Sequence, residues 1–365
     1  MKTVKDFDVQ GKRVLVRCDF DVPLDDKGIW AKRTSSSSLP SFPSEIKVLD
    51  DFRIREALPT IKYLIEKGAK VILMGHAGRP DGKVIEKLRL DPIQNKLMEY
   101  LDVSIVKAPD CIGLEIEKWT RQMHPGEILL LENLRFHIEE QENDDSFSKK
   151  LSKLGDIYIN NAFANSHRDH ASMTGVPKYL PAGASLTLLK EIEILGSLIK
   201  NPEKPLVVVI GGAKVEETKL KVIDRFSEVA EAFLVGRLVT AEIKNKKLRL
   251  NRSEKIVWPV DDMGGGKDIG PQTIKLFQEK ILKAKTVFWN GPLGKIEEKE
   301  FAKGTEAIAR AIINSSAFSV VGGGETVDFI NDLGLAEKFN HVSTGGGAML
   351  EFLSGEKLPG LVALK

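Results

Sequence analysis

The sequence predicts an α/β protein with two doubly wound parallel-sheet domains that face each other across a cleft and are joined by a helix. Short runs rich in Val, Ile and Leu alternate along the chain with longer segments of helical period, among them residues 54–68 and 301–312. The apolar runs are unbroken, which is typical of parallel strands covered by helices on both faces. Each half of the chain contains its own series of runs, so two sheets are expected.

Eight of these runs are expected to be strands. In the first half they are RVLVRCDF (13–20), KVILMGHAG (70–78), EILLLENLRF (127–136) and DIYINNAF (156–163). In the second half they are PLVVVIGG (205–212), EAFLVG (231–236), TVFWNGP (286–292) and AFSVVGGG (317–324). Several segments between them end in glycine just before the next strand, which is a common stop signal of a helix.

The two domains are expected to join near residues 179–205. LLKEIEILGSLIK (188–200) is interpreted as the connecting helix, and the proline-bearing segment after it ends that helix. We therefore expect one domain over residues 1–185 and a second over residues 186–347. Residues 29–46 contain six serines and two prolines without any period, which predicts a mobile, solvated loop with no functional motif.

The composition argues against several classes of protein. The chain has 365 residues, of which 42% are hydrophobic and 29% charged, as in soluble globular proteins. Its net charge of +2 is too small to favour nucleic acid or membrane surfaces. The two cysteines, Cys18 and Cys111, lie far apart, so neither a disulfide framework nor a zinc site is expected. The polar N-terminus and the absence of a bilayer-length apolar run predict a cytoplasmic protein.

Glycines gather at the ends of the expected strands in the second half. They lie at 211–212, 291–294, 322–324 and 345–347. Backbone N–H groups at a helix N-terminus bind anions, and a residue without Cβ lets a phosphate approach closely. These loops therefore predict a nucleotide or polyphosphate site. Lys214 could meet phosphate oxygens there, whereas Glu325 could either hold magnesium or only complement a helix dipole.

Two familiar nucleotide-binding fingerprints are missing from the sequence. There is no G-x-x-x-x-G-K-[ST] motif, so the predicted phosphate site is not a P-loop. No strand is followed by G-x-G-x-x-G either. A dehydrogenase that uses a dinucleotide is therefore disfavoured.

The strand ends of the first half carry basic residues instead. They are Arg17, His76, Arg79, Arg135, His167 and Arg168, with Asp19 and Asp21 after the first strand and Arg53 just before a helix. The planar fork of arginine matches carboxylate and phosphate oxygens in pairs. A basic pocket for a small, highly anionic substrate is therefore predicted. One anion site in each half suits phosphoryl transfer, because this reaction needs aligned substrates and neutralised charge more than a protein nucleophile. Since the two sites are expected on different domains, the domains are expected to close before transfer.

An ordered set of motifs resembles the phosphoglycerate kinase family over nearly the whole chain. In the first half they are RVLVRCDFDVP, DDFRIREALPTI, MGHAGRP, LLLENLRF and NNAFANSHRDHAS. In the second half they are GGAKV, DIGP, WNGPLG, FAKGTEAIA, FSVVGGGET and STGGGA. The resemblance implies an N-terminal domain that binds 3-phosphoglycerate and a C-terminal nucleotide-binding domain. It also implies that residues 348–365 return to the N-terminal domain.

The resemblance further implies roles for individual residues. Those that would bind 3-phosphoglycerate or its acyl phosphate are Asp19, Asp21, Arg53, His76, Arg79, Arg135 and Arg168. Those that would bind the nucleotide are Lys214, Lys219, Glu297, Gly323, Gly324, Glu325 and Thr326. Arg53, Lys214 and Gly346 would act on the transferring phosphoryl group, and Glu325 would be the protein ligand of Mg²⁺.

The implied activity is the reversible, Mg²⁺-dependent transfer of a phosphoryl group between ATP and the carboxylate of 3-phosphoglycerate in glycolysis. A cytoplasmic monomer that binds neither nucleic acid nor membrane is expected. Some features depart from the family. Asp21 replaces an asparagine, Glu325 replaces an aspartate, and residues 239–271 bridge a gap where the family has a longer segment lining the adenosine. Weak nucleotide binding is therefore expected, and a catalytically impaired homologue acting as an anion-binding or scaffold protein stays open as the alternative.

Overall fold

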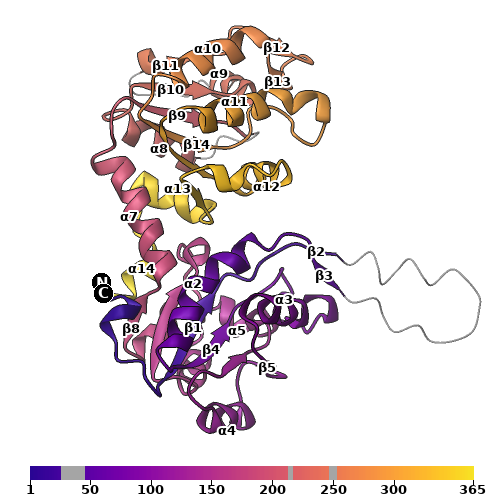
Figure 1. The fold of residues 1–365 in the computed structure, drawn as a ribbon, viewed down its shortest axis with the longest axis vertical. Coiled ribbons are helices and arrows are strands. Elements are labelled where there is room, and N and C mark those ends of the chain that lie inside the picture. The colour runs from indigo at the N-terminus through magenta and orange to yellow at the C-terminus, as the bar shows by residue number, and fades with distance from the viewer. Residues whose placement is uncertain (26–45, 213–216, 246–252) are drawn as a thin grey trace, which may run out of the picture. The chain divides into compact units, whose positions relative to one another are not determined.

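The computed structural model describes residues 1–25, 46–212, 217–245 and 253–365 (Figure 1). The chain divides into two compact units. One contains Met1–Lys190 and Leu358–Lys365, and the other contains Glu191–Lys357. The boundary falls within helix α7 (Leu186–Lys200), where the sequence predicts the connecting helix. Most of the serine-rich insertion, and Lys214, lie outside the described residues.

The first unit is built on a six-stranded sheet in the order β5-β6-β4-β1-β7-β8, in which all neighbouring strands are parallel. Its strands are β1 (Arg13–Cys18), β4 (Lys70–Met74), β5 (Ile105–Lys107), β6 (Ile128–Leu130), β7 (Ile157–Asn161) and β8 (Ala182–Ala184). Strand β1 lies at the centre, where Val14 pairs with Val71 on one side and with Ile157 on the other. These side chains are buried, which explains why the apolar run of β1 has no polar alternation.

The helices of this unit are α2 (Phe52–Glu66), α3 (Asp91–Leu101), α4 (Leu114–Gln122), α5 (Ile138–Gln141), α6 (Asp145–Ser152) and α14 (Pro359–Val362). Helix α2 buries Ile54, Ile61 and Leu64, whose spacing places them on one face of the helix. They join the apolar core made by β1 and β4. A short antiparallel pair, β2 (Leu24–Asp25) and β3 (Lys47–Val48), flanks the undescribed insertion.

The second unit repeats the plan with the strand order β11-β10-β9-β14-β15-β16, again parallel throughout. The strands are β9 (Leu206–Ile210), β10 (Ala232–Val235), β11 (Ile256–Val257), β14 (Thr286–Asn290), β15 (Phe318–Gly322) and β16 (His341–Ser343). An antiparallel pair, β12 (Asp262–Met263) and β13 (Asp268–Ile269), stands apart from this sheet. On β14, Trp289 is fully buried and packs against Phe339.

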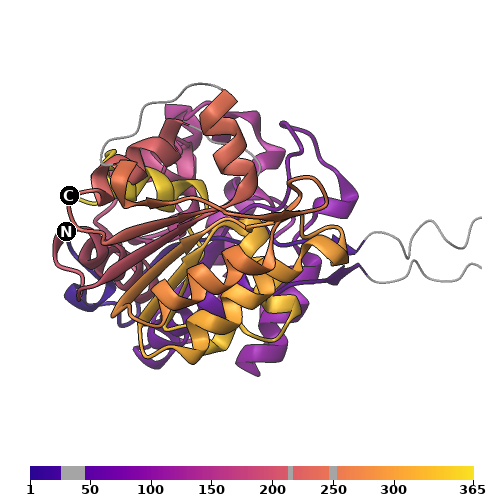
Figure 2. The same cartoon turned by 90° about the horizontal axis from the view of Figure 1, so that it is seen from above.

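Helices lie on both faces of the second sheet (Figure 2). They are α8 (Glu217–Phe226), α9 (Arg237–Asn245), α10 (Pro271–Ile281), α11 (Lys303–Asn314), α12 (Gly324–Asp332) and α13 (Gly347–Ser354). Helix α13 packs on α8, and α10 packs on α11. Each of these helices buries its apolar side against the sheet or its neighbour, as the helical period of the sequence requires.

The last eight residues belong to the first unit, although the residues just before them belong to the second. The amide of Gly360 donates to the carbonyl of Ser166 at 2.8 Å, and a Cβ at Gly360 would come within 3.0 Å of the Ser166 Cα. The returning segment therefore begins at Leu358 rather than at 348. Residues 348–357 stay with the second unit because α13 packs on α8.

All eight sequence-predicted strands are present, and the predicted architecture of two parallel-sheet α/β domains is confirmed. Four further strands, β5, β8, β11 and β16, extend the two sheets at their edges. Within the described ranges, no helix combines the length and apolarity needed to cross a bilayer.

Candidate active site

Cations gather at the carboxyl ends of four adjacent strands of the first unit. Arg17 lies on β1, His76 follows β4, Arg135 follows β6 in the short helix η3 (Leu134–Phe136), and Arg168 follows β7. Arg17 Nη2 lies 3.2 Å from His76 Nδ1. Strands that are far apart in sequence thus bring these charges to one edge of the sheet, where ligands of parallel α/β folds bind.

Two of the guanidinium groups in this cluster, those of Arg135 and Arg168, are incompletely paired. Arg135 is only 2% exposed, and its Nη1 donates to the carbonyl of Gly78 at 2.9 Å. Its Nε and Nη2 atoms are buried without any hydrogen-bond partner, as is Nε of Arg168. A buried donor without a partner is costly and rare in folded proteins. The cluster is therefore arranged to receive acceptor oxygens from a ligand.

Burial, together with repulsion among neighbouring cations, lowers the pKa values of one arginine and two histidines of this region. Burial, together with the positive charges of Arg168 and Arg17, lowers the pKa of Arg135 to about 10. Burial and the neighbouring guanidinium groups hold the pKa of His76 well below its ordinary value. Burial and Arg135 lower the pKa of His170 to about 4. Both histidines are consequently neutral at physiological pH in the unliganded protein.

The lowered pKa of His170 predicts how stability depends on pH. In the unfolded chain the pKa of His170 is the ordinary value of 6.5, whereas in the folded protein it is about 4. The histidine therefore contributes stability above pH 6.5 that is lost as the pH falls toward 4. In His170→Asn, we expect a smaller loss of unfolding free energy between about pH 7 and about pH 5, measured by urea titration.

The matched control for this measurement is His124→Asn. His124 is exposed on the same unit, and its Nδ1 lies 3.4 Å from Glu127 Oε1, away from the cation cluster. Its replacement should leave the pH dependence close to that of the wild type. An equal pH dependence in the wild type and in His170→Asn would contradict the assignment.

Asp19 and Asp21 contact the residues and loops of the cation cluster. Asp19 Oδ2 lies 2.6 Å from Nη1 of Arg53, at the start of α2. Asp21 Oδ1 accepts from the amide of Gly78 at 2.8 Å, and its Oδ2 lies 3.7 Å from His76 Nε2. The extra charge of Asp21 is thus tied to the loop after β4 and faces His76. Arg79, in the same loop, is exposed.

Sequence reasoning missed Glu140, which is 1% exposed. Its carboxylate accepts from Ser172 N at 2.9 Å and from Ser172 Oγ at 2.6 Å. Ser172 Oγ in turn accepts from Arg17 Nε at 2.8 Å, so the buried acid is linked to the cation cluster. Burial raises the pKa of Glu140.

In the second unit, glycine loops surround a cavity of about 550 Å³. Of the residues predicted to bind nucleotide or the transferring group, those that line it are Lys219, Gly323, Gly324, Glu325, Thr326 and Gly346. Sequence reasoning missed Asn290, Pro292 and Leu350, which line it as well. Lys219 Nζ donates to the carbonyl of Gly211 at 3.0 Å, which keeps its charge at this cavity.

Two helix N-termini open onto the cavity. Helix α12 begins at Gly324 after Gly323 (φ 101°), and α13 begins at Gly347 after Gly346 (φ 49°). The positive φ angles explain why glycine is favoured at both turns. A Cβ at Gly324 or Gly347 would meet no atom within 4 Å, so these glycines keep open space rather than close packing. The first N–H groups of both helices are available to an anion.

The other predicted nucleotide-binding residues differ in their exposure and in what they can contact. Glu297 is exposed and does not line the cavity. Thr326 is buried, and its hydroxyl accepts from the amide of Gly291 at 3.0 Å. It therefore supports a neighbouring loop. Glu325 is exposed in the first turn of α12, where its carboxylate suits both the helix dipole and a hard cation. Lys214 lies outside the described residues.

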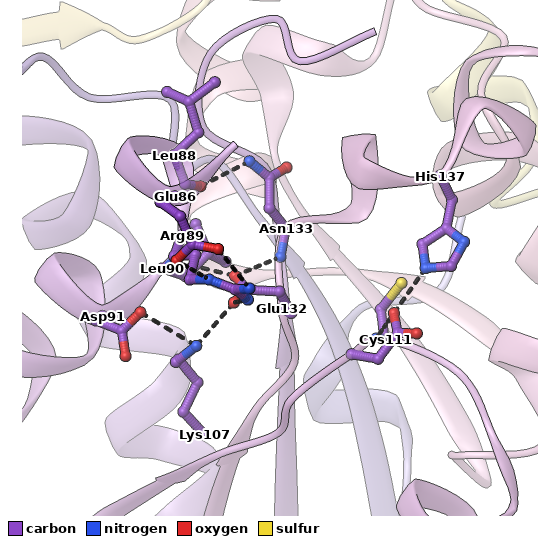
Figure 3. A network of polar contacts seen from close by, with 11 residues as sticks. Glu86, Leu88, Arg89, Leu90, Asp91, Lys107, Cys111, Glu132, Asn133 and His137 are labelled. Carbon is purple, nitrogen blue, oxygen red and sulfur yellow. Dashed lines mark hydrogen bonds and ion pairs between the residues drawn. The ribbon is translucent and has the colours of Figure 1, made fainter. Parts of the chain in front are cut away.

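One group of possible metal ligands occurs in the described part of the chain, formed by Asp110, Cys111 and His137. His137 Nε2 lies 2.6 Å from Asp110 Oδ1, which also accepts from the amide of Cys111 at 2.6 Å. The hydrogen bond to Asp110 raises the pKa of His137. The ion pair between His137 and Asp110 accounts for the arrangement without a cation. Figure 3 shows His137 beside Cys111.

Buried cations with unpartnered donors in one α/β unit, and helix N-termini around a glycine-lined cavity in the other, give each unit a candidate anion site, an arrangement that suits a two-domain α/β kinase. The family model described as "Phosphoglycerate kinase" matches residues 4–253 and 237–356. The chain belongs to the phosphoglycerate kinase family.

Individual relatives agree with this family over their full length. The phosphoglycerate kinase of Dictyoglomus turgidum is 42% identical over an alignment of 409 positions, covering 99% of this chain and 98% of the relative. That of Pelotomaculum thermopropionicum is 40% identical over 406 residues, covering 100% and 98%. The solved phosphoglycerate kinase of Pyrococcus horikoshii superposes with a TM-score of 0.83 at 33% identity, covering 100% and 98%. That of Coxiella burnetii gives 0.78 at 30% identity, covering 99% and 98%.

These similarities confirm the resemblance found in the sequence motifs. The family, the names of the relatives and the solved structures agree on a glycolytic kinase, so the protein is an enzyme that transfers a phosphoryl group. None of the comparisons supports the impaired homologue that the sequence left open.

Proposed function

We propose that this protein transfers a phosphoryl group reversibly between ATP and the carboxylate of 3-phosphoglycerate, with Mg²⁺ accompanying the nucleotide. The observation that carries the proposal is the set of buried guanidinium atoms of Arg135 and Arg168 that lack partners. A trianionic acid with a phosphate at one end supplies the acceptor oxygens that these donors need. Relatives with this name cover the whole chain.

On the acceptor side, the first unit binds and orients 3-phosphoglycerate. Arg135 and Arg168 hold the phosphate through their unpartnered N–H groups, beside His76 and Arg17. Arg53, anchored to Asp19, neutralises charge on the transferring group. The acceptor is a carboxylate, which is already ionised, so no general base is required.

On the donor side, the second unit holds the nucleotide phosphates. Lys219 and the N-termini of α12 and α13 supply positive charge around one cavity. Glu325 offers an oxygen ligand that fits Mg²⁺, because this ion takes one or two carboxylates together with phosphate oxygens and water. When bound, the ion neutralises charge on the phosphates. The hydroxyl of Thr326 is engaged by Gly291 and supports the loop.

The proposal includes a cytoplasmic monomer with one substrate per domain. The free, buried thiols of Cys18 and Cys111 support a reducing compartment. Weak contacts with the adenine base stay a prediction, because part of the shortened segment, residues 246–252, lies outside the described residues.

The proposed activity is tested by steady-state transfer from MgATP to 3-phosphoglycerate, with Arg53→Ala as the active-site variant. We expect turnover in the wild type and a loss of about a hundredfold or more in kcat in the variant, because Arg53 stabilises developing charge. Arg55→Ala is the matched control, since Arg55 lies on the same helix and pairs with Asp51 instead. Absence of turnover in a folded wild type would favour the anion-binding homologue.

A further inference from the structure

Two polar residues that follow β6, Glu132 and Asn133, are 2% and 0% exposed. Neither belongs to the cation cluster, although Arg135 comes only two residues later. Polar side chains this deeply buried must satisfy nearly all of their hydrogen-bonding groups within the protein. Their hydrogen-bond partners therefore show which segments are fixed to the end of β6.

The carboxylate of Glu132 fixes the strand end to its surroundings (Figure 3). It accepts from the backbone amides of Leu90 at 3.0 Å and Asn133 at 2.9 Å. It also pairs with Arg89 Nη1 at 3.1 Å and with Lys107 Nζ at 2.8 Å. One buried acid thus joins the end of β6 to the start of α3 and to the end of β5.

The side chain of Asn133 bonds to the segment that follows His76 and to the segment that carries Arg135. Its Nδ2 donates to the carbonyls of Ala77 at 2.8 Å and Leu88 at 2.9 Å. Its Oδ1 accepts from the amide of Arg135 at 3.1 Å. Ala77 lies between His76 and Gly78, and the carbonyl of Gly78 receives Arg135 Nη1. The one amide group therefore holds the loop after β4 and the segment carrying Arg135 together.

We propose that Asn133, fixed by Glu132, is a positioning residue that sets the spacing between the His76 loop and Arg135 and thereby the affinity for the anionic substrate. The inference rests on the proposed function for the identity of that substrate. Only an amide supplies two donors and an acceptor at this point. Aspartate has nearly the same shape but would place carboxylate oxygens against two carbonyl oxygens and drive the loop away.

The test is Asn133→Asp, with binding of 3-phosphoglycerate and of MgADP measured by titration calorimetry. We expect about tenfold weaker binding of 3-phosphoglycerate, because two hydrogen bonds that position the loop are lost. MgADP, bound by the other unit, should bind as to the wild type. In steady-state assays the KM for 3-phosphoglycerate should rise while the KM for MgATP stays unchanged, which a general loss of stability would not produce.

Controls separate positioning from stability and from the assumed substrate. Thr120→Val removes a buried hydroxyl bonded within α4 to the carbonyl of Glu117, so it should lower stability but leave binding unchanged. Inorganic sulfate, titrated in parallel, reports on the cation cluster whatever the physiological substrate is. If the wild type binds sulfate but not 3-phosphoglycerate, the proposed substrate is wrong. The positioning role of Asn133 is then tested by comparing the sulfate affinities of the wild type and the variant.

If Asn133→Asp does not fold, Asn133→Ser is measured in the same way, because its single, shorter hydroxyl cannot replace both donors of the amide and adds no charge. Glu132→Gln keeps the shape of the anchor but removes its charge, and should weaken binding less, in the same direction. Wild-type affinity for both sulfate and 3-phosphoglycerate in a folded Asn133 variant would overturn the proposal.

Discussion

Replacing Arg135 by methionine is expected to make the unliganded protein more stable while weakening its binding of 3-phosphoglycerate by about a hundredfold. The free protein buries a guanidinium group with two unpartnered nitrogens beside Arg168 and Arg17. Methionine matches the aliphatic stem of arginine, is apolar, and among the contacts of the described residues gives up the bond to the Gly78 carbonyl. Removing a buried, poorly paired charge commonly stabilises a protein, here by about 1 kcal/mol. The variant, however, no longer offers the guanidinium donors of Arg135 to the ligand.

Urea unfolding with and without 3-phosphoglycerate measures both effects in one experiment. The ligand should raise the unfolding free energy of the wild type and leave that of the variant nearly unchanged, since a ligand stabilises only the state that binds it. Arg13→Met is the matched control on the same unit. Arg13 Nη2 pairs with Asp156 at 2.6 Å, so its loss should destabilise the protein and spare the ligand effect. An unliganded Arg135→Met as destabilised as Arg13→Met would show that the guanidinium is satisfied without substrate.

The architecture could be predicted because its signal is local. Unbroken apolar runs reported the buried strands of both sheets, and every predicted strand is present. The missed strands lack that signal: β8 is Ala-Gly-Ala, without any β-branched or aromatic side chain, and β11 has two residues. Their pairing is decided by neighbours far away in sequence.

The site residues were predicted unevenly for a similar reason. Arginines at strand ends are visible in the sequence, because the ends of parallel strands share one edge. Glu140, by contrast, lies in the acidic run EEQEND, which has the composition of a surface segment. Its burial follows from contact with Ser172, 32 residues later. Likewise, the partners of Asn133 at Ala77 and Leu88 come from 56 and 45 residues away, beyond the reach of any local pattern.

The glycines of the second unit fall into two physical groups, which predict opposite outcomes for the same substitution. A Cβ at Gly211 would lie 2.1 Å from the carbonyl oxygen of Pro292 and 2.4 Å from that of Gly291. Those loops are held together by Gly212 N, which donates to Pro292 O at 2.6 Å. Gly211→Ala must therefore push the ends of β9 and β14 apart, at a cost of about 3 kcal/mol. At Gly347, nothing lies within 4 Å.

Gly347→Ala is accordingly expected to fold with unchanged or slightly higher stability and yet to bind MgADP about tenfold more weakly. The added methyl stands in the cavity at the first turn of α13, where phosphate oxygens would approach the backbone. Gly196→Ala on α7, also in open space, is the control that should gain stability and bind as the wild type. Thermal unfolding and calorimetry separate the two effects. Full MgADP affinity in Gly347→Ala would mean that this glycine serves the turn into α13 and not a phosphate.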